Sequence, residues 1–221
     1  MKPAFLVSLL AALVLGAALL TLNIIRPGPD NGRIEERCRA GVTGPLAWEP
    51  SRLPVHVVVD PSAGSWMATL IEAAKAWNAA AGREVLTVEP AAETSWVEYA
   101  DALAGAGREP AGTAFVYSSI EPMLSAPRMA GIEDPWGLTR LRWRPDTCAL
   151  GYAVVWLRDS PDSLGASFAS EVATHELGHV LGLAHDGRTT SIMVRDLARP
   201  GPDHPTFPHE ITAHDAAIVA Q

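Results

Sequence analysis

Three of the seven histidines in this chain lie within eleven residues, in the segment THELGHVLGLAHD (174–186). His175 and His179 are four residues apart, which in a helix places them about 40° apart on one face, so that both imidazoles can bind one metal ion. Zinc favours such nitrogen ligands, and a catalytic zinc keeps one position open for water. Glu176 faces the same side of the helix, where a carboxylate can act as a general base.

The third histidine, His185, requires a break in that helix. If the helix continued past His179, His185 would lie about 9 Å further along the axis and roughly 240° around it, out of reach of the same ion. Gly182 lies between the two and can adopt a positive φ without steric cost. The spacing therefore predicts a helix that carries two ligands, an exit at Gly182, and a third ligand on the returning chain.

Hydrophobic patterns predict the elements that would position this segment. We expect strands at 53–60, 84–90, 113–119, 138–145 and 151–159, and helices at 65–82, 167–183 and 209–220. Ser65 is expected to cap the first helix and Gly82 to end it. Alternating apolar and charged residues in 138–145 indicate a strand at a sheet edge, whereas the apolar 151–159 indicates a buried strand. This order predicts an α/β or α+β domain with one sheet and few helices.

The segment HELGHVLGLAH resembles the zinc-binding consensus of the metzincin metallopeptidases. The bare H-E-x-x-H pattern has many chance matches, but the glycine and the third histidine add two fixed positions. Met193 in TSIMV follows the third histidine by eight residues, which is similar to the methionine turn of the matrixin branch. The resemblance implies that His175, His179 and His185 bind zinc. It also implies that Glu176 is the general base and that Met193 forms the base of the site.

The matrixin resemblance extends over residues 53–220. AAKAWNAAAG resembles the first helix of that fold, GYAVVWLRD the strand before the active-site helix, and ITAHDAAIVA the closing helix. It implies an α+β catalytic domain of the zincin type. A mixed five-stranded sheet would carry a long helix, the active-site helix and a C-terminal helix. Asp186 stands where matrixins more often have serine, and Val194 stands where a Tyr-Pro pair is commoner.

Other polar residues give weaker signals. Asp159 and Asp162 could contact a calcium ion, although loop aspartates are usually solvated. His204, His209 and His214 are expected to be solvated residues of a loop and a helix.

The first 25 residues are distinct from the rest of the chain. Residues 3–25 carry no charge and form either a cleaved signal peptide or a membrane anchor. A signal peptide needs a shorter apolar region with a small-residue exit, which 16–18 could supply, whereas the whole run reaches the about 20 apolar residues of an anchor. Residues 26–52 are rich in proline, glycine and charge, as expected of a linker and domain edge, and 53–221 form the catalytic domain. Cys38 and Cys148 are expected to form a disulfide in an exported protein, with two free thiols as the alternative.

Composition narrows the class of protein. The 221 residues are 48% hydrophobic and 19% charged, which is typical of a globular domain, and the net charge of −8 argues against a nucleic-acid partner. We expect a monomeric zinc metalloendopeptidase with a polypeptide substrate. It would be secreted, or membrane-anchored through residues 3–25 with its catalytic domain outside the cytoplasm. The alternative is a non-catalytic exported or tethered protein that uses zinc structurally.

Overall fold

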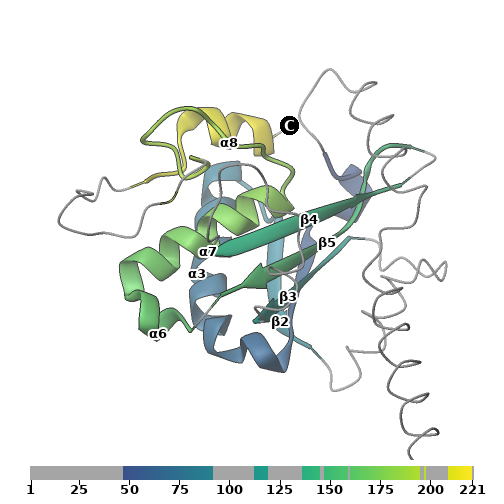
Figure 1. The fold of residues 1–221 in the computed structure, drawn as a ribbon. Helices are drawn as coiled ribbons and strands as arrows, with labels where there is room; N and C mark the ends of the chain where they lie inside the picture. The colour runs from purple at the N-terminus through teal and green to yellow at the C-terminus, as the bar shows by residue number, and fades with distance from the viewer. Residues whose placement is uncertain are drawn as a thin grey trace, which may run out of the picture.

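The computed structural model describes residues 47–91, 112–118, 136–144, 147–158, 160–194, 197 and 209–220. Its strands are β1 (Val55–Val59), β2 (Leu86–Pro90), β3 (Thr113–Ser118), β4 (Gly137–Trp143) and β5 (Leu150–Leu157). Its helices are α3 (Met67–Ala81), α6 (Pro161–Leu164), α7 (Ala166–Val180) and α8 (Ala213–Val219), with 3₁₀ turns η1 (Pro50–Arg52) and η2 (Pro61–Trp66). Figure 1 shows their arrangement.

The five strands form one mixed sheet in the order β2-β1-β3-β5-β4. β1 pairs parallel with β2 and β3, and β3 pairs parallel with β5. β4 pairs antiparallel with β5 and lies at the edge of the sheet. The predicted α+β class with a mixed five-stranded sheet is confirmed, as is the edge position of the strand that alternates apolar and charged residues.

Helices α3 and α7 pack against each other over one face of the sheet, and β4 runs alongside α7 (Figure 1). Side chains alternate between the two faces of a strand, so Val155 and Leu157 of β5 join the core beneath the helices. The alternate residues Tyr152, Val154 and Trp156 form a second buried cluster. Burial on both faces explains why β5 reads as a continuous apolar run.

The start of the long helix differs from the prediction. Ser65 does not cap it, because a 3₁₀ turn from Pro61 to Trp66 leads directly into α3. The cap lies earlier, where the Asp60 carboxylate accepts the Ser62 N–H at 2.8 Å. The predicted end is confirmed, since Gly82 adopts φ 66° immediately after the last helical residue.

Several predictions concern residues outside the described ranges. They include the leader at 1–25, the part of the 26–52 linker that precedes residue 47, Cys38, Asp159 and His204. Cys148 is disulfide-bonded, and because Cys38 is not described, the pairing of the two cysteines stays a prediction. Among the described residues, no helix combines the length and apolar character needed to cross a membrane.

Candidate metal centre

Helix α7 presents His175, Glu176 and His179 from its buried half. Ala173, Leu177 and Val180, on the other side of the helix, are part of the core between helices and sheet, which fixes how the helix is rotated. His175 and Glu176 are consequently almost fully buried, at 5% and 4% exposure. The i, i+4 stripe of histidines predicted from the sequence is therefore held in place by the packing of the opposite side of the helix.

The chain leaves α7 at Gly182, as the spacing predicts. Gly182 adopts φ 93°, in the region that favours glycine. Its N–H donates to the His179 carbonyl at 2.9 Å, and the Leu183 N–H donates to the Gly178 carbonyl at 3.1 Å. This pair of hydrogen bonds is a Schellman motif, which closes the end of a helix and turns the following chain back.

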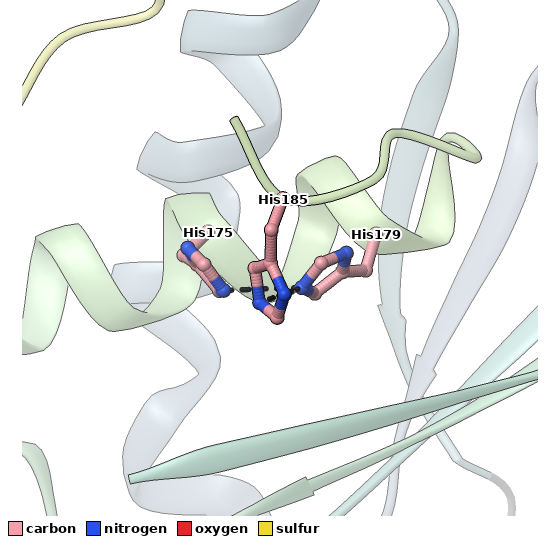
Figure 2. A group of neighbouring side chains, drawn as sticks. All are labelled: His175, His179 and His185. Atoms are coloured by element: carbon pink, nitrogen blue, oxygen red, sulfur yellow. Dashed lines mark hydrogen bonds between the residues drawn. The ribbon is translucent and has the colours of Figure 1, made fainter. Parts of the chain in front are cut away.

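The turn brings His185 onto the two helical histidines. The Nε2 atom of His179 lies 3.1 Å from Nε2 of His175 and 3.2 Å from Nε2 of His185. Figure 2 shows His175 and His179 projecting from α7 and His185 reaching them from the returning loop. The three side chains form the one cluster of metal-ligand type found among the described residues.

The opposite ring nitrogens determine which tautomer two of these histidines adopt. Nδ1 of His175 lies 2.7 Å from the Ile192 carbonyl, and Nδ1 of His179 lies 2.8 Å from the Leu183 carbonyl. A carbonyl oxygen only accepts, so each Nδ1 carries the proton and each neutral ring presents a lone pair at Nε2. Two lone pairs about 3 Å apart repel each other unless a cation lies between them.

The donor set and its spacing fit zinc. Two Zn–N bonds of about 2.0–2.1 Å at a tetrahedral angle would place their nitrogens about 3.3 Å apart. The two short Nε2–Nε2 distances are close to that value. Three neutral imidazoles also leave a fourth tetrahedral position for a water or substrate oxygen.

Replacing Gly182 by valine is expected to weaken zinc binding, although Gly182 has no side chain to bind it. A β-branched residue at φ 93° is strained, and relief of the strain would displace His185 and the Leu183 carbonyl that orients His179. Zinc affinity can be measured by competition with a chromogenic chelator. Gly187→Val is the matched control, because a Cβ at Gly187 meets nothing within 4 Å. Equal affinity in Gly182→Val and wild type would contradict this account of the turn.

Met193 lies directly beneath α7. It is fully buried, and a Cβ added at Gly178 would overlap its sulfur and lie 2.8 Å from Cζ2 of Trp77. Trp77 also donates from Nε1 to the Thr174 carbonyl at 2.8 Å. Helix α7 can therefore pack this closely against Met193 and Trp77 only because residue 178, between His175 and His179, is glycine.

The turn that carries Met193 is fixed to α8 and to the returning loop. The Ser191 hydroxyl donates to the buried Asp215 carboxylate at 3.1 Å and accepts the Met193 N–H at 3.0 Å. Asp215 also accepts the Thr212 N–H at 2.9 Å in a capping box. The Asp186 N–H donates to the Met193 carbonyl at 2.7 Å. The C-terminal helix thus helps to hold the floor of the site.

Burial shifts the titration of three groups at the site. It lowers the pKa of His175 from 6.5 to about 3 and that of His179 from 6.5 to about 4. Burial raises the pKa of Glu176 from 4.5 to about 7, an effect that the hydrogen bond from Thr139 opposes. In the metal-free protein near neutral pH, both imidazoles are therefore neutral, as metal ligands must be.

The metal-free protein is expected to lose stability as the pH falls from 6 to 5. In this range the unfolded chain protonates His175 and His179, which stay neutral when folded, whereas the folded chain protonates Glu176, which is ionised when unfolded. The unfolded state therefore binds about one more proton, which lowers the free energy of unfolding by about 1.4 kcal/mol per pH unit.

Urea unfolding with a chelator present, at pH 6 and pH 5, measures this slope. In Glu176→Gln the compensating carboxyl is absent, so the slope should rise to about two protons, or about 2.7 kcal/mol per pH unit. A variant slope no steeper than that of wild type would refute the assignment.

The surroundings of His209 differ from the prediction of a solvated residue. Its side chain is 14% exposed, and Nδ1 lies 2.7 Å from Oε2 of Glu171, one helical turn before His175. These two residues line an open pocket together with Thr174 and Ile192. No local pattern in the sequence indicates the contact, because 38 residues separate its partners.

Of the two predicted calcium contacts, Asp162 lies in the first turn of α6, and calcium binding stays a prediction.

The sequence of this chain also matches that of a known protein family. A sequence model of the matrixin family matches residues 91–219, which is 129 of the 221 residues. The match includes β3 to β5, the active-site helix α7, the returning loop and α8. A search of curated proteins finds no match.

Proposed function

The chain belongs to the matrixin family, and from this premise we propose that it is a zinc-dependent endopeptidase that hydrolyses polypeptides with Glu176 as general base. Family membership implies a zinc metallopeptidase. The observation that carries the proposal is the convergence of the Nε2 atoms of His175, His179 and His185, on and after a helix that also carries the buried Glu176.

The zinc ion and Glu176 would have separate roles in hydrolysis. A zinc ion held there would polarise the scissile carbonyl and lower the pKa of water toward 7. Glu176 would take the proton from the attacking water as the new C–O bond forms, and then give it to the leaving nitrogen as the C–N bond breaks. Among the described strands β4 is the edge strand beside α7, and this edge suits an extended peptide, which could add to the sheet as a further strand.

The alternative, a non-catalytic protein with structural zinc, needs a fourth protein ligand. The cluster formed by the described residues has three members. Asp186, the nearest candidate in the sequence, directs its carboxylate to Arg188 instead, accepting from the backbone N–H at 3.0 Å and from Nη1 at 3.2 Å. These contacts favour a site with an open position.

Removal of the metal tests the proposal. The purified chain is expected to cleave an unfolded protein, to lose this activity when treated with a chelator, and to regain it when zinc is restored. Cleavage that persists in chelator would point to a contaminating or metal-independent peptidase. A complete absence of cleavage with zinc bound would favour the structural role.

Export is a separate proposal. The uncharged run at 3–25 and the disulfide at Cys148 both suit an oxidising compartment outside the cytoplasm. Amino-terminal sequencing of the mature protein, with membrane and medium analysed separately, would distinguish a cleaved leader from an anchor. A chain found only in the cytoplasm would overturn export.

A further inference from the structure

The side chain of Glu176 is enclosed by two residues of the edge strand β4. The Thr139 hydroxyl donates to Oε2 of Glu176 at 2.5 Å. Two residues earlier in the strand, a Cβ added at Gly137 would overlap Oε1 and lie 2.6 Å from Cγ and 2.7 Å from Cδ of Glu176. Residues two apart in a strand face the same side, so Gly137 and Thr139 both face α7.

This contact restricts the conformation of the carboxyl. A glutamate has three side-chain torsions, and its terminal torsion has only broad preferences, so the helix alone does not fix where the two oxygens lie. The Thr139 hydroxyl has one proton, and the carboxylate oxygen at 2.5 Å is closer than the Glu176 backbone carbonyl at 3.3 Å. The hydrogen bond engages Oε2, and Oε1 lies against Gly137.

We propose that Thr139 and Gly137 are positioning residues for the hydrolytic reaction, which hold the Glu176 carboxyl in one orientation from the strand opposite. Thr139 acts by donating to Oε2, and Gly137 acts by leaving the space that the carboxyl fills. The inference rests on the proposed function, because it assigns these residues to the reaction in which Glu176 is the base. It places part of the catalytic machinery on β4, 37 residues from the helix motif.

Three variants separate positioning from simple stability. Thr139→Val keeps the shape and strand preference of threonine but removes the donor, and is expected to lower kcat by about 10- to 100-fold, as for a misplaced catalytic group. KM and zinc affinity should stay within about twofold of wild type. Thr139→Ser restores the hydroxyl and should return kcat to within about threefold. Gly137→Ala should lower kcat as Thr139→Val does, because the methyl group displaces the carboxyl.

Each variant has a matched control. Thr87→Val removes a hydroxyl from β2, on the opposite edge of the sheet, where Thr87 bonds to the exposed His56. Gly64→Ala adds a methyl where nothing lies within 4 Å. Both controls should leave kcat unchanged.

A second measurement uses the metal-free protein and needs no activity. Thr139→Val should lower the thermal midpoint by about 2–4 °C in the wild-type background, as expected for loss of one partly buried hydrogen bond in a domain of this size. In the Glu176→Ala background the carboxylate acceptor is absent and only the longer contact to the backbone carbonyl of residue 176 remains, so the same substitution should have a smaller effect. Equal shifts in the two backgrounds would overturn the contact itself.

The kinetic results distinguish the possible failures. An unchanged kcat in Thr139→Val overturns the positioning role, and so does a Thr139→Ser protein as slow as Thr139→Val, since the loss would then be structural. A wild-type chain that shows no chelator-sensitive cleavage refutes the proposed function, and with it this inference. In that case the thermal shifts still report whether the hydrogen bond exists.

Discussion

Glu176→Gln is expected to lower kcat for peptide hydrolysis by about 10²- to 10⁴-fold, the range that general acid–base groups contribute. Glutamine keeps the size of the side chain and can still accept a hydrogen bond from Thr139, so the fold should be unchanged. It cannot take a proton from water near neutral pH. Because Glu176 is not one of the three converging ligands, zinc affinity should stay within a few-fold of wild type.

Single-turnover cleavage of a quenched fluorescent peptide measures the rate, and metal content is determined on the same samples. Glu72→Gln is the control, since Glu72 is an exposed residue of α3 that pairs with Lys75 of the same helix. A fully active, zinc-loaded Glu176→Gln protein would show that another group serves as the base.

His185→Ala is expected to weaken zinc binding by more than about 100-fold. Loss of an outer-shell group already costs about 10- to 100-fold, and this substitution removes one of three ligand atoms. His185 is the exposed member of the cluster, so truncation opens no cavity in the core, and the metal-free fold should be retained. Hydrolysis should fall in parallel at limiting zinc.

Thermal unfolding with and without zinc gives an independent measure of zinc binding, because a ligand that binds only the folded state raises the midpoint of thermal unfolding. The rise seen for wild type should be largely lost in His185→Ala and kept in His214→Ala, where an exposed histidine of α8 is removed. If zinc raised the midpoint of His185→Ala as much as that of wild type, His185 would not be a ligand.

The fold followed from the sequence where the pattern was local. The apolar run of β5, the alternation in β4 and the glycine end of α3 each depend on residues close together in the chain, and all were predicted near their observed positions. The predicted start of α3 was wrong, because in the sequence alone Ser65 fits a helix cap as well as Asp60 does. The preceding 3₁₀ turn, which begins at Asp60, decided the start instead.

The sequence by itself determined that the three histidines, the candidate zinc ligands, converge. The interval of four residues, the glycine and the interval of six already define a helix, an exit and a return, because each step depends only on backbone geometry over one or two turns. The structure adds what lies around those ligands. His175 takes its tautomer from the carbonyl of Ile192, Met193 is held by α8, and Glu176 is oriented by Thr139. These partners come from segments 17 to 37 residues apart in the chain. Local periodicity does not specify such contacts. They depend on the packing of α7 against α3 and β4 and on the hydrogen bond between Ser191 and Asp215 of α8.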